Sequence, residues 1–410
     1  MTWLLDDDLL DGFASRVLFH ALYGGADFGE VRTTCDRVTA AFADGDDRLA
    51  AWHREWTATA DRVDGIGDDA AAAGHPVSAR EAHLRAVGYH RAAWSPFFGP
   101  TVSPELASSS AREWDALGKV AARWDPGVEV LTIPYEGTTL TALLVRATDD
   151  DTPRPTVVCT NGYDGTVGEM FVAHAMAATR RGYHCVVFDG PGQGRPLVDQ
   201  GLHLRPDWER VVSPVLDVVV EHPAVDTDRV VLHGWSLGGF LAPRAAGGET
   251  RLAALVADPG QWDQRDNLLA NLPLDDDQKA AFPDIDPAAL DPMQQFLDDP
   301  AAPGALRWRM LQRGPLVHGT TTLLETLTAL SQLTVSDVAG DIRCPTLLTA
   351  AEGDPTAAGA PKLLDAIGAD TKQLVHFTDA EGAGGHCEGT ARSLLHQRMY
   401  DWLDEVLAPR

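Results

Sequence analysis

A serine stands between two glycines in the segment Gly234-Trp235-Ser236-Leu237-Gly238. Glycine permits a turn that is too tight for side chains two residues before and two residues after the serine. Residues 230–233 read as a short buried strand, and a helical pattern follows the segment. Strand, strained turn and helix together form a nucleophile elbow, which lifts the serine hydroxyl above the carboxyl edge of a parallel sheet. We therefore predict Ser236 as a nucleophile.

A serine hydroxyl is a weak nucleophile until a base takes its proton, and the base needs a third group that orients it. In α/β-hydrolases, which contain this elbow, an acid follows the serine along the chain and a histidine follows the acid. Asp354 lies just past a predicted strand at 345–350. This places it at the carboxyl edge of the parallel sheet, where ligands bind. Asp258, after the preceding strand, and Glu352 are the rival acids. The order favours Asp354.

The predicted base is His386, in a glycine-rich loop between the last predicted strand and the last helix. Other histidines fit less well. His376 falls inside a strand, His396 falls inside a helix too late in the chain, and His233 precedes the elbow as a core residue. Cys387 has no elbow of its own, so we interpret it as a small buried neighbour of the base.

A tetrahedral intermediate needs hydrogen-bond donors for its oxyanion. One donor is expected to be the backbone N–H of Leu237, which follows the nucleophile. The other is expected from the loop 161–166 after the third strand, through the backbone of Tyr163. Because this loop should face the elbow, we predict that Gly162, Tyr163 and Trp235 contact the substrate.

No cofactor is predicted. The segment 189–194, Asp-Gly-Pro-Gly-Gln-Gly, lacks the lysine of a phosphate-binding loop, and we interpret it as a stiff loop that shapes the pocket floor. No Cys/His cluster has zinc spacing, and no dinucleotide-binding glycine pattern follows a strand. The expected partner is a small-molecule substrate with no metal, and a homodimer is left open.

The composition of the chain excludes several classes of partner and location. The chain has 410 residues, 44% of them hydrophobic, and a formal charge of −27. So acidic a surface repels phosphate backbones, which argues against a nucleic-acid partner. No run of about 18 apolar residues suggests a membrane span, and the N-terminus has no secretory pattern. Five scattered cysteines form no disulfide framework, so a cytoplasmic location is expected.

Residues 1–125 show apolar residues at helical spacing and no alternation with period two. The expected helices are 9–23, 31–42, 48–63, 82–94 and 103–123. Ser78, with Glu81 three residues later, reads as the N-cap of the helix that contains 82–94. We predict an N-terminal all-helical cap domain over 1–125.

Strand patterns dominate the remainder, 126–410. The predicted strands are 128–135, 140–146, 156–160, 183–188, 230–233, 252–257, 345–350 and 373–377. The first two form a hairpin, and the others mostly alternate with helices, so the sheet should be mostly parallel. The predicted fold is therefore an α/β-hydrolase fold with an eight-stranded sheet, and 262–338 is expected to be a helical insertion.

Several of these motifs resemble the dihydropseudooxynicotine hydrolase family, from about residue 30 to the C-terminus. The segments are Ser78-Ala79-Arg80 with Arg85-Ala86-Val87-Gly88-Tyr89-His90-Arg91-Ala92-Ala93, Asn161-Gly162-Tyr163-Asp164-Gly165-Thr166, Phe188-Asp189-Gly190-Pro191-Gly192-Gln193-Gly194, Gly234-Trp235-Ser236-Leu237-Gly238-Gly239 and Gly385-His386-Cys387. Related fungal pigment-pathway enzymes shorten polyketides. The resemblance implies a serine hydrolase whose N-terminal helices cap the site and whose scissile bond is a C–C bond next to a ketone, or an ester.

Three functions are thus in competition. The first is hydrolysis of a C–C bond next to a ketone in a polyketide-like or aromatic substrate, with an electron sink that stabilises the carbanion leaving group. A carboxylesterase or thioesterase would use the same Ser-His-Asp set. A non-catalytic hydrolase-fold binding protein is the third, and the intact set of three residues speaks against it.

Overall fold

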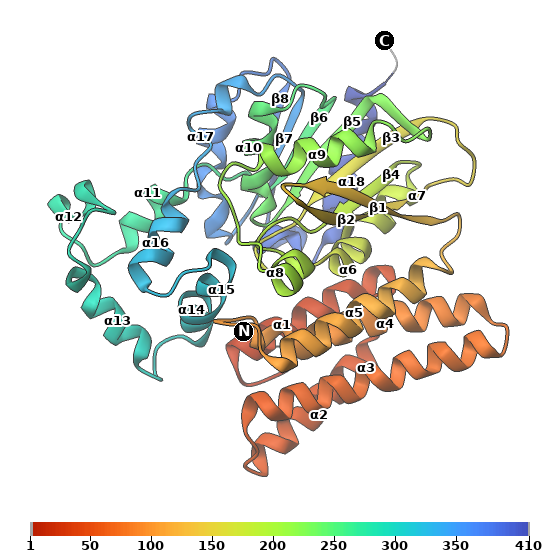
Figure 1. The fold of residues 1–410 in the computed structure, drawn as a ribbon, viewed down its shortest axis with the longest axis horizontal. Coiled ribbons are helices and arrows are strands. Elements are labelled where there is room, and N and C mark those ends of the chain that lie inside the picture. The colour runs from red at the N-terminus through yellow and green to blue at the C-terminus, as the bar shows by residue number, and fades with distance from the viewer. Residues whose placement is uncertain (1–2, 409–410) are drawn as a thin grey trace.

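One sheet of eight strands forms the centre of the molecule, in the order β1-β2-β4-β3-β5-β6-β7-β8 (Figure 1). The computed structural model describes residues 3–408. The strands span Val128–Tyr135 (β1), Thr138–Val145 (β2), Arg154–Thr160 (β3), His184–Phe188 (β4), Val225–Trp235 (β5), Ala254–Asp258 (β6), Thr346–Ala351 (β7) and Lys372–Phe377 (β8). β1–β2 and β2–β4 pair antiparallel, and the other neighbours pair in parallel. The predicted eight-stranded, mostly parallel sheet is confirmed.

Strand β5, which leads into the elbow, begins earlier than the predicted residue 230. Its first residue, Val225, pairs with Arg154 of β3 across an irregularity in the register. Between Val225 and the buried part of the strand, Asp226 and Arg229 form an ion pair at 2.5 Å. Because these residues are polar, the apolar pattern in the sequence begins only at residue 230, and the predicted strand was therefore too short.

Helices cover both faces of the sheet (Figure 1). On one face lie α9 (Glu209–Val219), α10 (Gly238–Gly248) and α17 (Ala360–Ala366), and α8 (Gly194–Gln200) lies at the edge nearest the N-terminal helices. On the other face, α6 (Val167–Met170), a π-helical turn (Phe171–Ala175) and α7 (Met176–Arg180) pack beside α18 (Arg392–Val406). The rings of His174 and His396 meet between these last two groups, with centroids 5.5 Å apart.

The N-terminal helices precede the sheet, as predicted. They are α1 (Asp8–Leu18), α2 (Phe28–Ala43), α3 (Arg48–Ala72), α4 (Pro76–Trp94) and α5 (Pro104–Ala121). Trp52 and Trp56 of α3 are fully buried, and the Trp56 ring lies 5.9 Å from that of Tyr89 on α4. These two tryptophans lie on one face of α3, and this face packs against α4.

Two details of the N-terminal prediction were wrong. Helix α4 begins at Pro76 after the N-cap residue His75, so Ser78 lies inside the first turn instead of capping it. Proline is favoured at a first helical position because its φ is preset and its missing N–H would have had no partner there. Helix α3 continues to Ala72, well past the predicted end at residue 63.

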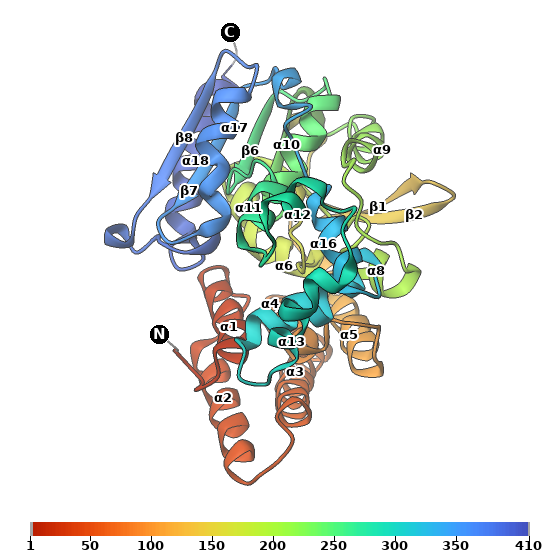
Figure 2. The ribbon, with the colours of Figure 1, turned by 90° about the vertical axis from the view of Figure 1, so that its left-hand side faces the viewer.

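A helical segment without named strands connects β6 to β7. Its helices are α11 (Gln264–Asn271), α12 (Asp276–Ala281), α13 (Asp291–Asp298), α14 (Gly304–Trp308), a π-helical turn (Arg309–Arg313), α15 (Gly314–His318) and α16 (Leu323–Ser331). The segment has a small apolar core of its own and reaches the N-terminal helices, where Phe13 meets Trp308 with ring centroids 5.1 Å apart (Figure 2). Division of the chain into domains at 125/126 and an insertion at 262–338 stays a prediction.

None of the helices within residues 3–408 combines the length and apolar character that crossing a membrane would require.

Trp52 gives a test of the N-terminal core. Its side chain is fully buried, and its indole N–H donates to the carbonyl of Ala92 at 2.8 Å. Trp52→Ala is expected to lower the free energy of unfolding by about 3–5 kcal/mol in urea titrations, because it leaves a large cavity. Phe296, whose exposed fraction is 51%, is the control, and Phe296→Ala should change stability by no more than about 0.5 kcal/mol. Equal effects would contradict this packing.

Candidate active site

Ser236 occupies the sharp turn between β5 and α10. Its φ is +59°, in the left-handed region that is uncommon for residues other than glycine. Its backbone N–H donates to the carbonyl of Asp258 at 2.7 Å, which fixes the turn to the end of β6. A Cβ atom on Gly234 would lie 1.9 Å from the Gly238 carbonyl oxygen, and one on Gly238 would lie 2.5 Å from that of Thr160. Both glycines of the motif are therefore required by close backbone approach.

His386 lies between Ser236 and Asp354. The Oγ atom of Ser236 is 2.8 Å from Nε2 of His386, and Nδ1 of His386 is 2.8 Å from Oδ2 of Asp354. The His386 side chain is 47% exposed, whereas that of Asp354 is 1% exposed. The structure thus brings together the three residues that the sequence singled out, with the histidine open to the outside and the carboxylate shielded.

Asp354 is held in place by the turn that follows β7. It is the N-cap of a 3-10 helix at Pro355–Gly359, and its Oδ1 accepts hydrogen bonds from the backbone N–H and the hydroxyl of Thr356, at 2.9 and 2.7 Å. Burial opposes ionisation of this carboxyl group. The hydrogen bond and charge of His386, together with the Thr356 donors, outweigh that effect and lower the pKa of Asp354 below its ordinary value.

The carboxyl groups of the two rival acids bind other partners. Asp258 is fully buried at the end of β6 and accepts a hydrogen bond from the Thr349 hydroxyl at 2.8 Å. Glu352 accepts a hydrogen bond from the backbone N–H of Asp379. His376 lies in β8 and His396 in α18, as predicted.

His233 is fully buried, with Nδ1 at 3.7 Å from the sulfur of Cys159. Its position in β5 agrees with the prediction of a core histidine. Cys387 is buried beside His386, as expected, and burial raises the pKa of its thiol well above the ordinary value. The thiol therefore keeps its proton and does not compete with Ser236.

The loop 161–166 faces the elbow. A Cβ atom on Gly162 would lie 2.8 Å from Cβ of Ser236, so only glycine allows this approach. The N–H of Gly162 donates to the side chain of Asn161. By contrast, the backbone N–H groups of Tyr163 and Leu237 have no acceptor within residues 3–408. Two donors near the nucleophile are thus available to an incoming oxygen atom.

Two glutamines support these backbone segments, and neither role was evident from the sequence. Gln193 is fully buried and donates to the carbonyls of Asn161 and Gly162, at 2.8 and 2.9 Å. Gln261 follows β6 and donates to the carbonyl of Ser236 at 2.5 Å. The 189–194 segment therefore braces the 161–166 loop, a function that its glycine-rich composition did not indicate.

The predicted substrate-contact residues differ in their surroundings. The Tyr163 ring is packed between the guanidinium of Arg313, 4.2 Å from its centroid, and the ring of His318. Trp235 is 5% exposed, and the guanidinium groups of Arg16 and Arg392 lie 5.7 and 5.0 Å from its ring centroid. Contact of either residue with a substrate stays a prediction.

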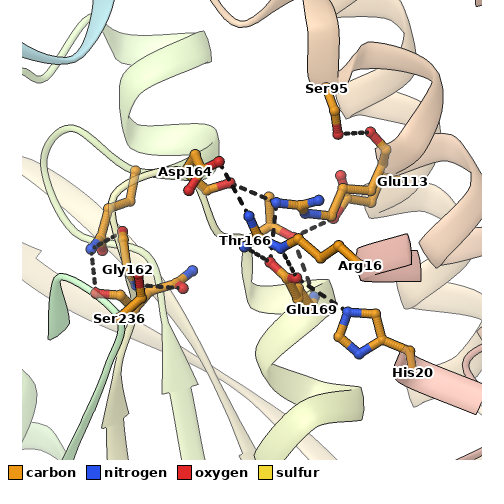
Figure 3. A network of polar contacts seen from close by, with 12 residues as sticks. Arg16, His20, Ser95, Glu113, Gly162, Asp164, Thr166, Glu169 and Ser236 are labelled. Carbon is orange, nitrogen blue, oxygen red and sulfur yellow. Dashed lines mark hydrogen bonds and ion pairs between the residues drawn. The ribbon is translucent and has the colours of Figure 1, made fainter. Parts of the chain in front are cut away.

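A buried ionic network joins the N-terminal helices to the loop that faces Ser236 (Figure 3). Arg16 of α1 contacts Glu169 at 2.5 Å and Asp164 at 3.2 Å. Arg91 of α4 contacts Glu169 at 3.1 Å and donates to the carbonyl of Asp164 at 2.8 Å. Burial opposes the charge on Glu169, but the charges of Arg16 and Arg91 outweigh it and lower its pKa well below the ordinary value.

A second buried carboxyl group is part of the same interface. Glu113 of α5 accepts hydrogen bonds from the hydroxyl of Thr166 at 2.5 Å and from the indole N–H of Trp94 at 2.8 Å. Burial raises the pKa of Glu113 to about 7, against the opposing charge of Arg91. Both ends of the helix α6 segment, at Thr166 and Glu169, are therefore tied to N-terminal helices.

Within residues 3–408, no cluster of three or more His, Cys, Asp or Glu side chains has an arrangement that could bind a metal ion.

Several known proteins are similar to this chain in sequence. Residues 157–389 match the model of the "Alpha/beta hydrolase family". The hydrolase LUC6 of a Fusarium species is 32% identical over 96% of each chain, and the 20-hydroxy-prefusarin hydrolase FUS2 of Gibberella moniliformis is 30% identical over 96% of this chain and 95% of its own. The chain belongs to the alpha/beta hydrolase family. It is therefore a hydrolase, as its sequence predicted.

A similar fold is found in the solved structure of the 2,6-dihydroxy-pseudo-oxynicotine hydrolase. It superposes with a TM-score of 0.72 over 95% of this chain and 96% of the other, at 22% identity. The similarity includes the N-terminal helices, since it covers nearly the whole length of both chains. It confirms, at the level of the fold, the resemblance that the motifs indicated.

Glu169 gives a test of the network in this hydrolase. Glu169→Gln removes the charge that Arg16 and Arg91 share in a buried site, so unfolding in urea should become easier by about 3–5 kcal/mol. The control is Asp36→Asn in the pair Arg32–Asp36, whose side chains are 49% and 55% exposed. Exposed pairs contribute about 1 kcal/mol or less. A Glu169→Gln effect as small as that of the control would contradict a stabilising role for the network.

Proposed function

We propose that this hydrolase uses Ser236 as its nucleophile, His386 as its general base and Asp354 as the carboxylate that orients the base. The observation that supports this proposal is the unbroken contact chain from Ser236 Oγ to His386 Nε2 and from His386 Nδ1 to Asp354 Oδ2, each at 2.8 Å. An ionised Asp354 selects the tautomer in which Nδ1 carries the proton and Nε2 is free to accept one.

In the first half of the reaction, the proton of Ser236 Oγ moves to Nε2 of His386 while Oγ attacks the substrate carbonyl. The carbonyl oxygen becomes an oxyanion, and the free N–H groups of Leu237 and Tyr163 are the donors that we assign to it. The intermediate then breaks the bond to the leaving group, which takes the proton from His386. Water, activated by the same histidine, releases the acyl group from Ser236.

We propose a C–C bond next to a ketone as the scissile bond, in a polyketide-like or aromatic substrate. The resemblance of the motifs to the dihydropseudooxynicotine hydrolase family supports this choice, and a relative 30% identical over nearly the whole chain bears the name of 20-hydroxy-prefusarin hydrolase. A carbon leaving group departs as a carbanion, so its departure depends on an electron sink in the substrate and on protonation by His386.

Carboxylic esters and thioesters form the alternative substrate class, because the same hydrogen-bonded residues catalyse acyl transfer from them. The two classes are separated by a matched panel of β-diketones and esters with the same acyl groups. Preference for the diketones in kcat/KM supports C–C hydrolysis, whereas turnover of the esters alone would contradict it. Failure of both classes, together with no labelling of Ser236 by a fluorophosphonate, would favour the binding protein.

Removal of the nucleophile should lower the catalytic rate strongly. Ser236→Ala is expected to lower kcat by about 10⁴ or more on whichever substrate class is turned over, with an unchanged unfolding midpoint. His386→Ala should have a similar effect, and the double variant should be no worse than either single variant, because the pair acts as one unit. An activity loss of less than about tenfold for Ser236→Ala would remove it from this role.

The acid is tested with two carboxylates on the same loop. Asp354→Asn preserves the shape of the side chain but removes its charge and allows the wrong histidine tautomer, so kcat should fall by about 10⁴ at neutral pH. The matched control is Glu352→Gln, two residues away, whose carboxylate accepts its hydrogen bond from the backbone N–H of Asp379. Comparable losses in the two variants would contradict the assignment of Asp354.

A further inference from the structure

Two carboxyl groups that the proposed reaction does not use are buried next to the Ser236–His386 pair. Asp258 ends β6, Glu388 stands two residues after His386, and both are fully buried. The Oδ1 atom of Asp258 accepts the Thr349 hydroxyl, but its Oδ2 atom and both side-chain oxygens of Glu388 have no donor in the described part of the chain. Two ionised carboxylates with only one donor between them would be very costly in such a site.

The two carboxyl groups belong to segments that pack against each other. The sulfur of Cys387 lies 3.7 Å from the carbonyl oxygen of Asp258, so the His386 loop packs directly on the end of β6. The next residue, Glu388, is close enough to Asp258 for the Asp258 carboxyl group to influence the charge of the Glu388 carboxyl group. A hydrogen bond between two carboxyl groups requires a proton on one of them, because ionised carboxylates only accept.

The other charges around Glu388 come from two further elements. Asp354, after β7, adds a negative charge, and Arg392 of α18 adds a positive one. The Arg392 guanidinium is buried against Trp235, and its Nε atom has no hydrogen-bond acceptor among residues 3–408. Burial first, and then the charge and hydrogen bond of Asp258, raise the pKa of Glu388 to about 11, with Arg392 opposing them. The proton therefore remains on Glu388 at neutral pH.

We propose that Glu388 is a positioning residue whose protonated carboxyl group donates a hydrogen bond to the Asp258 carboxylate and thereby fixes the His386 loop against the strand end that holds Ser236. The effect on the reaction rests on the proposed function, since it acts through His386.

Backbone geometry explains why the loop needs this contact. Cys387 and Glu388 both have positive φ, 53° and 47°, which costs free energy in residues with a Cβ atom. Asp258 lies on the other side of the contact and accepts the backbone N–H of Ser236 at 2.7 Å. One hydrogen bond between side chains therefore joins the strained turn after the base to the residue that anchors the nucleophile.

The retained proton can be measured without a substrate. At about pH 8, the infrared spectrum of the whole protein should contain the C=O stretch of a protonated carboxylic acid that Glu388→Gln removes. Asp258→Asn should remove it as well, because the asparagine amide can donate to an ionised Glu388. A spectrum in which neither variant removes such a band would overturn the proposal.

The pH dependence of stability gives a second readout. A carboxyl group whose pKa is raised on folding contributes stability below its ordinary pKa and loses it as the pH rises toward the raised value. The unfolding equilibrium constant of the wild type, divided by that of Glu388→Gln, should therefore rise by about tenfold per pH unit between about pH 5 and 9.

Glu249 is the matched control for that measurement, since it is also buried but is paired with Arg251 at 2.6 Å. Burial opposes its charge, and the hydrogen bonds and charge of Arg251 outweigh that effect and lower its pKa. The same ratio for Glu249→Gln should be flat over this range. A flat ratio for Glu388→Gln would mean that Glu388 is ionised, which overturns the proposal.

The positioning role is tested by the rate at which a fluorophosphonate labels Ser236, which needs no knowledge of the substrate. Glu388→Leu, with no donor, should lower this rate by about ten- to a hundredfold, because His386 is displaced. Glu388→Gln keeps a hydrogen-bond donor and should therefore retain most of the wild-type labelling rate. Equal rates in Leu and Gln variants would overturn positioning by the hydrogen bond. No labelling of the wild type would instead contradict the proposed function, while the infrared and stability results would still decide the state of the proton.

Discussion

The close approach of three backbone segments at the elbow is the constraint on which the rest of the structure depends. Ser236 can adopt its left-handed conformation only because Gly234 and Gly238 allow neighbouring carbonyls within the space of a Cβ atom. The strained turn is then fixed from outside the motif, by the carbonyl of Asp258 and the side chain of Gln261. A strained backbone conformation at a functional residue persists only when surrounding contacts hold it in place. Here those contacts come from residues at the end of β6 and just after it.

The same reasoning extends from the elbow to the N-terminal helices. Besides its ion pair with Arg313, Asp164 of the loop that faces Ser236 binds two arginines of the N-terminal helices: its carboxylate pairs with Arg16, and its backbone carbonyl accepts a hydrogen bond from Arg91. Those arginines in turn need Glu169. The N-terminal helices are thus more than a cover, since their charges and those of the α/β part are satisfied only when both are folded together.

Sequence patterns revealed the parts of this molecule that depend on local rules. The elbow, the eight strands and the chain order that points to Ser236, Asp354 and His386 follow from spacing and from the alternation of strands and helices. Gln193, Gln261 and Arg16 were missed because their partners lie far away in the chain, where no periodicity records them. The N-cap of α4 was misplaced because a capping pattern at Ser78 competed with the proline two residues before it.

Asp354, Asp258 and Glu388 are buried carboxyl groups near His386, and their environments assign them different states. Asp354 has donors from Thr356 and the charge of His386, which keep it ionised. Asp258 and Glu388 have one donor between them, from Thr349, so a proton must take the place of the missing ones. A further carboxylate near an imidazole would favour the imidazolium, which cannot accept a proton from a serine. A neutral Glu388 therefore lets the loop be anchored by a carboxyl group without weakening its histidine as a base.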